Sequence, residues 1–158
     1  MAWSASKIGA VSVLHMLDRT SAIDMDGDSF KAALYDNDIT PDNSVTAANF
    51  AFNAGQWATA GNEVADGAEW ATGGVVLTGH DVTQSTTTIK WDANDTPSTG
   101  SSATLANVYG CLVYDDTITT PTADIGICYN YFGGVNSVTD GTFTIVWSAS
   151  GIFTISVA

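Results

Sequence analysis

Basic residues are scarce in this sequence. Four lysines and arginines stand against 17 aspartates and glutamates in 158 residues, which gives a formal net charge of −13. A chain this acidic cannot neutralise a row of phosphates, so binding of nucleic acid or of an anionic membrane surface is excluded. Charged residues make up only 13% of the chain, about half the usual share. Because 45% of the residues are hydrophobic, disorder is excluded as well.

Long apolar runs are also missing. The longest apolar stretch, residues 8–17, is interrupted by Ser12 and His15 and is too short to cross a bilayer. Asp18 and Arg19 follow it where a signal peptide would have small residues at its cleavage site. The sequence therefore predicts neither a membrane span nor a secretion signal.

Cysteine is nearly absent, since the chain has only Cys111 and Cys128. Two cysteines are too few for a disulfide framework or a zinc site. Both lie within apolar runs, which favours buried free thiols. A cross-strand disulfide between them is the alternative.

The uncharged remainder is rich in residues of strands and turns, with 21 threonines, 14 serines, 9 asparagines and 15 glycines. Threonine favours strands, and the other three favour turns. Apolar alternation or apolar runs between turn signals mark seven strands: residues 29–35, 75–83, 87–92, 103–114, 124–132, 142–147 and 152–157. This spacing predicts an all-β fold, a single antiparallel β-sandwich of the jelly-roll or Ig-like type.

Two regions depart from the strand pattern. Residues 1–28 are expected to form an N-terminal arm that docks on a neighbour, with the sandwich domain in residues 29–158. The alternative is that the segment belongs to the sandwich itself. Residues 42–54 are expected to hold a short helix with Ser44 as its N-cap. A long glycine-rich loop over residues 55–74 follows it, and such loops are usually functional or packed against a partner.

Some strands carry further expectations. Residues 103–114 are apolar on both faces, which places that strand between two layers. Strict alternation puts Val108 on the face of Leu112, and Tyr109 on the face of Cys111. The pair Gly133-Gly134 is expected to end the preceding strand.

The motifs for chemistry are incomplete. Asp24, Asp26 and Asp28 alternate, but the glycine and the glutamate of a calcium-binding EF-hand are not at their positions, so we expect a solvated turn. An irregular calcium site in an adhesion module is the alternative. His15 and His80 have no metal ligand at a suitable spacing, and we expect structural roles for both.

Catalytic motifs are absent too. The only glutamates, Glu63 and Glu69, bracket a loop and give no sign of a glycosidase pair. There is no Gly-x-Ser-x-Gly elbow and no glycine-rich phosphate loop with a lysine. The sequence therefore predicts a protein that is not an enzyme and has no cofactor and no metal.

The five tryptophans fall into two groups. Trp91 and Trp147 take inward strand positions and are expected in the core, whereas Trp3, Trp57 and Trp70 lie outside clear strands. Aromatic side chains in loops are typical of protein interfaces, and carbohydrate platforms are the alternative. The candidate partner-binding residues are those of the arm and the long loop: Trp3, Ile8, Leu14, Trp57 and Trp70.

Three short motifs occur in a familiar order: Lys31-x-Ala33-Leu34-Tyr35, then Asn62-Glu63-Val64 with Gly67, Trp70 and Gly73-Gly74, and finally Gly151-Ile152-Phe153. In this order the chain resembles small structural proteins of tailed bacteriophages, especially those that infect actinobacteria. The resemblance covers most of residues 28–155. It departs at Trp70, where the group usually has tyrosine, and over residues 47–60, which do not match.

The resemblance implies a virion component, with no catalytic residues. We expect a capsid decoration, or cement, protein on the outside of the shell, where acidic charge keeps it away from the packaged DNA. Its partner is then the major capsid protein, and it forms a homo-oligomer, with a trimer as one possibility. The alternative is a tail or fibre component that binds a host-surface glycan.

Overall fold

Antiparallel strands dominate the computed structural model, which describes residues 3–157. Strands account for 39% of the residues, and α1 (Ala10–Asp18) is the one α-helix in the described range. No helix in residues 3–157 combines the length and the apolar character that crossing a bilayer requires. The prediction of an all-β antiparallel fold is confirmed.

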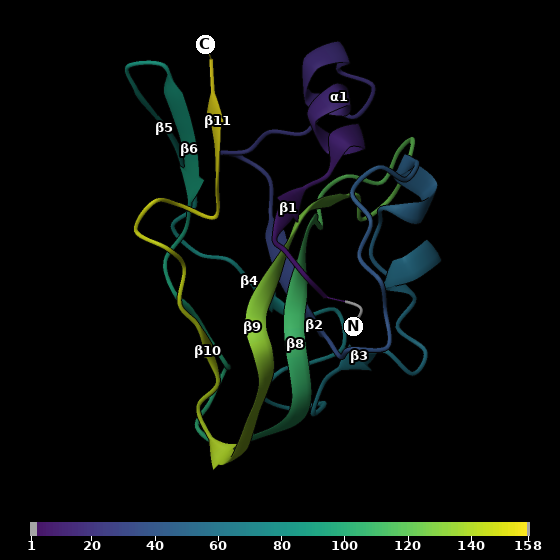
Figure 1. Ribbon diagram of the computed structural model, residues 1–158, viewed down its shortest axis with the longest axis vertical. Coiled ribbons are helices and arrows are strands. Elements are labelled where there is room, and N and C mark those ends of the chain that lie inside the picture. Colours follow the sequence, from purple (N-terminus) through teal and green to yellow (C-terminus); the bar gives the residue numbers. More distant parts are fainter. Residues whose placement is uncertain (1–2, 158) are drawn as a thin grey trace.

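A six-stranded antiparallel sheet forms the centre of the molecule (Figure 1). Its strands, in spatial order, are β1 (Lys7–Ile8), β9 (Gly126–Gly141), β8 (Ala103–Asp115), β2 (Phe30–Tyr35) and β3 (Glu63–Val64), with β4 (Val75–Val76) also on β2. The two long strands β8 and β9 pair along most of their length, and β2 pairs with β8 over all six of its residues.

Two small antiparallel sheets lie on one side of this central sheet (Figure 1). One joins β7 (Thr96–Pro97) to β10 (Thr144–Ile145). The other has β6 (Thr88–Asp92) between β5 (Asp81–Ser85) and β11 (Phe153–Ser156). The arrangement is sandwich-like, with two small sheets in place of one opposing layer.

Both faces of the central sheet are buried. The face toward the small sheets is covered by the strand-side core, whose main members are Phe30, Leu34, Trp70, Trp91, Cys111, Val113, Ile127, Ile145 and Trp147. The other face is covered by the loop-side core: Trp3, Ala33, Tyr35, Ile39, Phe50, Trp57, Leu112, Tyr114 and Tyr129. Neighbouring residues of β8 alternate between the two cores, so the prediction that this strand lies between two layers is confirmed.

A glycine in β8 allows the N-terminal segment to pack closely on the central sheet. A Cβ atom added at Gly110 of β8 would lie 2.5 Å from the Trp3 ring and 2.5 Å from the Asn130 carbonyl oxygen. Such distances are far inside van der Waals contact. A glycine here therefore lets a large aromatic ring lie directly on the strand backbone.

The N-terminal segment belongs to the domain, and the prediction of a separate arm is wrong for residues 3–28. Lys7 and Ile8 pair with Tyr129 and Cys128 of β9, and Trp3 is fully buried in the loop-side core. Burial of a tryptophan and strand pairing both attach the segment to its own chain. The first two residues of the predicted arm lie outside the described residues.

The predicted helix over residues 42–54 is wrong. The region holds two short 3₁₀ helices, η1 (Ala47–Asn49) and η2 (Gly55–Trp57). Ser44 does not cap a helix, because its hydroxyl donates to the Asp42 carboxylate over 2.6 Å and forms a local turn. Local turns of this kind compete with helix formation.

Two strand boundaries also differ from expectation. The predicted strand over residues 75–83 is divided into β4 and β5, because Gly79 takes a positive φ of 60° between them. Conversely, β9 does not end at Gly133-Gly134: the glycines form an irregularity with φ of 80° and 159°, and the strand continues to Gly141. Glycine permits such backbone bends without steric cost.

The alternation predicted for residues 103–114 fails at one end of the strand. Val108 lies in the strand-side core with Cys111, and Tyr109 packs on the loop-side core with Leu112. The register with β9 shifts on both sides of Val108. A bulge changes which face each residue points to, so strict alternation assigns this segment wrongly.

Candidate interaction surface

The three tryptophans predicted as interface anchors lie inside the protein. Trp3, Trp57 and Trp70 are each 0% exposed. A side chain without exposed surface cannot contact a partner that docks on this folded domain, so their assignment as contact residues is wrong. The physical reason is that the central sheet has two faces to cover, and loops supply much of that cover.

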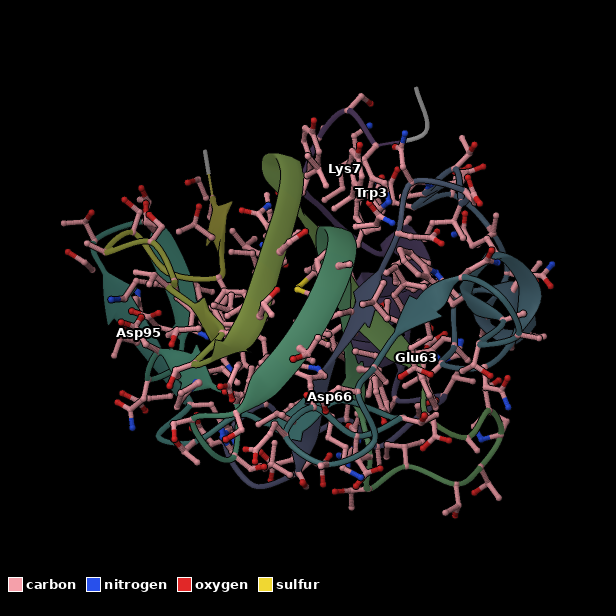
Figure 2. All side chains as sticks on the ribbon, turned by 90° about the horizontal axis from the view of Figure 1, so that it is seen from below. Trp3, Lys7, Glu63, Asp66 and Asp95 are labelled. Carbon is pink, nitrogen blue, oxygen red and sulfur yellow. The ribbon has the colours of Figure 1, made fainter. Side chains whose placement is uncertain are left out.

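Trp3 and Trp57 hold the loop-side core together. The Trp3 indole N–H donates to the Asp36 carbonyl oxygen over 2.6 Å, and its ring meets that of Trp57 edge-on at 5.9 Å. The Tyr35 hydroxyl donates to the Trp57 carbonyl oxygen over 2.7 Å. In Figure 2, Trp3 and Glu63 lie on this side of the sheet and Asp95 lies on the opposite side.

Trp70 is held in place by a single carboxylate. Asp66 Oδ1 accepts hydrogen bonds from the backbone N–H groups of Ala68, Glu69 and Trp70, at 2.8 to 3.1 Å, while its Oδ2 accepts one from Thr104 over 3.1 Å. Burial raises the pKa of Asp66, but these hydrogen bonds together outweigh it and hold the pKa below its usual value. The long loop is thereby tied to β8.

The remaining two predicted residues differ in exposure. Ile8 is half-buried and packs against the strand-side core, whereas Leu14 on α1 is 54% exposed. Leu17, three residues further along the same helix, is 79% exposed. Leu17 is not among the predicted contact residues, although its spacing of three residues from Leu14 would place both on one face of a helix.

The opposite side of α1 anchors the helix to the domain. The Ser12 hydroxyl donates to the Gly126 carbonyl oxygen at the start of β9. The buried His15 ring pairs through Nδ1 with the Ser21 hydroxyl over 2.9 Å, which gives His15 the structural role that was predicted. An anchored helix with outward leucines is a candidate contact surface.

This surface lies at one end of the molecule. In Figure 1, α1 and the tips of β5, β6 and β11 project from the same end. Val157, which follows β11, is 60% exposed there. We call Leu14, Leu17 and Val157 the apolar end.

The predicted turn at residues 24–28 is confirmed, and its carboxylates bind backbone. Asp24 Oδ1 accepts from the N–H groups of Asp26 and Gly27, and Asp28 Oδ2 accepts from the Asp24 N–H over 2.7 Å. Asp26 Oδ1 accepts from the Val82 N–H over 2.8 Å and so ties the turn to β5. Among the described residues, no three acidic, histidine or cysteine side chains are arranged to hold a metal ion.

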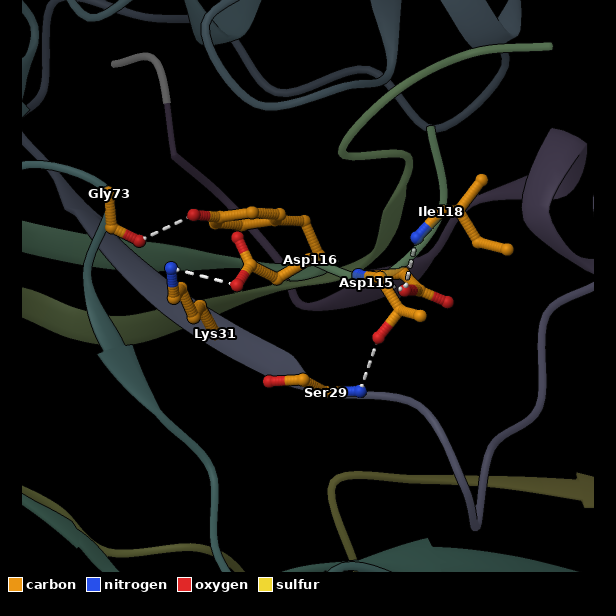
Figure 3. Close-up of polar contacts among 8 residues, drawn as sticks. Ser29, Lys31, Gly73, Asp115, Asp116 and Ile118 are labelled. Carbon is orange, nitrogen blue, oxygen red and sulfur yellow. Dashed lines mark hydrogen bonds and ion pairs between the residues drawn. The ribbon is translucent and has the colours of Figure 1, made fainter. Parts of the chain in front are cut away.

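A second carboxylate group lies at the end of β8 (Figure 3). Asp115 is 0% exposed, and its Oδ1 accepts from the N–H groups of Thr117 and Ile118 at 2.8 and 3.1 Å. Its Oδ2 is buried and has no hydrogen-bond partner among the described residues. Burial, together with the nearby Asp28 carboxylate, raises the pKa of Asp115 to about 6.

The neighbouring contacts fasten the same region (Figure 3). Lys31 Nζ pairs with the Asp116 carboxylate at 2.8 Å, and the Tyr114 hydroxyl donates to the Gly73 carbonyl oxygen over 2.7 Å. These bonds join β2, β8 and the loop before β4. The carboxylates of Asp115 and Asp116 bind backbone N–H groups and one lysine, so their role here is structural.

Other buried polar groups are held by packing more than by hydrogen bonds, since both ring nitrogens of His80 and Glu63 Oε2 have no hydrogen-bond partner among the described residues. Glu63 Oε1 accepts from the Gly73 N–H over 2.7 Å, and burial raises the pKa of this carboxyl. The His80 ring packs edge-on against Phe30 at 5.3 Å. Cys111 and Cys128 are buried free thiols in the strand-side core, as predicted, and burial raises the pKa of both.

Comparison with known protein families, curated proteins and solved structures gives no significant match.

Proposed function

We propose that this chain is a non-enzymatic structural protein of a bacteriophage virion, which decorates the outside of the capsid shell and stabilises it. The observation that carries the proposal is the apolar end: Leu14 and Leu17 are 54% and 79% exposed on a helix whose other side is anchored. Exposed apolar side chains on a firmly held element are typical of protein contact sites. The motifs shared with small phage structural proteins support the same function.

Charge placement supports an outer position for the chain. Most of the carboxylates lie outside the strands, in turns and loops such as residues 24–28 and 36–42. Acidic turns repel other particles and the packaged DNA, while the apolar end remains free to bind the major capsid protein.

The test is the binding of purified chain to capsid shells that lack it, measured by co-sedimentation and by the temperature at which the shells rupture. We expect binding and a higher rupture temperature. The double variant Leu14→Asp with Leu17→Asp is expected to bind at least about tenfold more weakly, because each carboxylate must be desolvated at the interface.

The matched control is Val76→Asp, since Val76 is 45% exposed on β4 and lies outside the apolar end. We expect it to bind shells within about twofold of the unaltered chain, as for a surface change away from the contact. The proposal is contradicted if the unaltered chain does not bind shells and their rupture temperature does not change.

We also propose that the chain forms a homo-oligomer, with a trimer as the first candidate, because subunits bound around the symmetry axes of a shell contact one another. Sedimentation of the isolated protein tests this. For a trimer, the mass from sedimentation equilibrium is three times the chain mass of 16.4 kDa. A mass equal to that of one chain at all protein concentrations contradicts self-assembly.

The alternative function, a tail or fibre component that binds a host glycan, rested on loop tryptophans as sugar platforms. Trp3, Trp57 and Trp70 are buried and offer no ring face to a sugar. No observation on the described residues favours this alternative.

A further inference from the structure

A groove follows the free edge of β9. Three hollows of about 360, 300 and 270 Å³ lie one after another between residues 128–136 of β9 and residues 143–154. Tyr131 lines the first two hollows, and Ile152 lines the second and third. Because neighbouring hollows share lining residues, they form one continuous groove, along which Figure 1 shows β10 and the chain toward β11 running beside β9.

One wall of the groove is a strand edge that is only partly used. β1 occupies its first part, where Lys7 pairs with Tyr129. The backbone N–H of Tyr131 donates to the Ser6 hydroxyl over 2.9 Å. A side chain, and not the backbone of an adjacent strand, is therefore its partner. The chain then turns toward Trp3 in the loop-side core, and no strand among the described residues continues this pairing along β9.

The backbone beyond Tyr131 is accessible. A Cβ atom added at Gly133 or Gly134 would meet nothing within 4 Å, and Val135 is 56% exposed. An accessible strand edge offers unpaired backbone donors and acceptors to another strand.

The opposite wall is also a strand edge. The Phe143 carbonyl oxygen accepts from the Ser98 N–H over 2.7 Å, so the backbone of Phe143 points toward β7. The direction of the backbone groups alternates along a strand, and Thr144 and Val146 therefore point the other way. Both of these residues line the groove.

The lining of the groove stands out by its charge. In a chain with 17 acidic residues, the three hollows are lined by no carboxylate, and Lys7 at one end is the one charged residue among their lining side chains. Lys7 forms no ion pair with any described residue. The groove therefore fits an uncharged segment that ends in a carboxylate beside Lys7.

We propose that this groove binds an extended segment of a partner protein as an added strand between β9 and β10. The segment pairs with the same edge of β9 as β1 does, and we propose that it has the same antiparallel direction. Its C-terminal end then lies next to the start of β1, beside Lys7. It carries apolar and hydroxyl side chains, with an acidic group at that end. Because residues 143–154 form a second wall opposite β9, we assign the groove to a single extended segment, and a second copy of this chain is an outcome that the test distinguishes. This site is independent of the apolar end and of the capsid proposal.

The test uses a defined probe, the N-acetylated and C-terminally amidated heptapeptide Ser-Val-Thr-Ile-Ser-Val-Asp, titrated into isotopically labelled protein and followed by amide NMR signals. We expect the signals of Tyr131, Thr144 and Val146 to shift together and the N–H exchange of Thr144 and Val146 to slow. The same peptide with lysine at its last position is expected to bind about two- to fivefold more weakly at low salt, the effect of one exposed ion pair.

A variant pair separates the groove from the rest of the surface. Val146, which is 72% exposed, lines the groove, and Val76, which is 45% exposed, lies outside both the groove and the apolar end. Val146→Asp is expected to weaken peptide binding by about tenfold, because it sets an unpaired carboxylate in the groove. Val76→Asp is expected to leave peptide binding unchanged.

The inference is overturned if the aspartate-ended peptide shifts none of these three amides, or if Val146→Asp and Val76→Asp bind it equally. It is also overturned if the same amides shift with protein concentration alone, since a second copy is then the occupant. Shell binding through Leu14 and Leu17 is a separate measurement. A negative result for peptide binding in the groove therefore does not contradict the capsid proposal, and a negative result for shell binding does not contradict the groove.

Discussion

The two faces of the central sheet bury similar aromatic side chains in different ways. The strand-side core is covered mainly by the two small sheets, with Trp70 as a contribution from the long loop. Trp91 on β6 and Trp147, two residues after β10, occupy inward positions of a regular alternation along the chain. The loop-side core is covered by segments with little regular structure, and Trp3 and Trp57 come from an N-terminal segment and a 3₁₀ helix. The difference shows that alternation identifies the strands of a sheet but not the segments that cover it.

The largest expected effect tests whether the two cores contribute equally. Trp57→Ala and Trp91→Ala should each lower the free energy of unfolding by about 3–5 kcal/mol, because both side chains are buried with 0% and 1% of their surface exposed. Urea denaturation measures both. If Trp57→Ala lowers it by less than about 1 kcal/mol while Trp91→Ala has its full effect, the loop-side core is only an accessory layer.

A smaller effect tests the contact between loop and strand. Gly110→Ala adds a methyl group 2.5 Å from the Trp3 ring, and we expect the free energy of unfolding to fall by about 1–3 kcal/mol through overpacking. Combining Gly110→Ala with Trp3→Ala separates the clash with the Trp3 ring from other effects of the added methyl group. Because the clash with the ring disappears, while the clash with the Asn130 carbonyl oxygen remains, Gly110→Ala should then have less effect than it has alone. Equal effects in both backgrounds contradict the packing of Trp3 on β8.

A pH-dependent effect tests the buried carboxyl of Asp115 at the end of β8. The two residues before it, Val113 and Tyr114, lie in the strand-side and the loop-side core. The pKa of Asp115 is about 6 in the folded protein, above its ordinary value of 3.8, so the folded state holds the proton more tightly. The stability from this group is present below about pH 4 and is lost as the pH rises through 6. Asp115→Asn should therefore be more stable than the unaltered chain at pH 8, by on the order of 1–3 kcal/mol, and equal to it near pH 4.

The measurement is urea denaturation at pH 4, 6 and 8, with Asp140→Asn as a control at an exposed aspartate. Only the Asp115→Asn curve should diverge from that of the unaltered chain as the pH rises. A difference that is constant over this range would mean that Asp115 does not titrate in the folded protein between these values.

The smallest effect sharpens the contrast between core and surface. Leu17→Asp should change the free energy of unfolding by no more than about 0.5 kcal/mol, because the side chain is 79% exposed. Thermal denaturation is sufficient to measure it. A loss of several kcal/mol would place Leu17 in a third buried cluster.

Local residue patterns were enough to predict the strand class and several strands. The prediction of β2 was correct because Phe30, Ala32 and Leu34 alternate with polar or small residues between acidic turns. The alternation of Ile145 and Trp147 against the exposed Val146 was likewise correct. In each case the signal lies within a few neighbouring residues.

The binding surface was harder to predict, because exposure depends on distant parts of the chain. A tryptophan in a loop has the same local sequence whether it faces a partner or its own sheet, and only the position of Gly110 opposite Trp3 decides it. The groove arises from the juxtaposition of residues 128–136 and 143–154. No periodicity within either segment indicates this pairing.

The burial of Trp3 also has a kinetic consequence. Its ring packs against Tyr129 and Tyr131, at 6.0 and 6.4 Å, so two almost opposite ends of the chain must meet before the loop-side core closes. Contacts this distant in sequence slow folding, so we expect this chain to fold in milliseconds to seconds rather than microseconds.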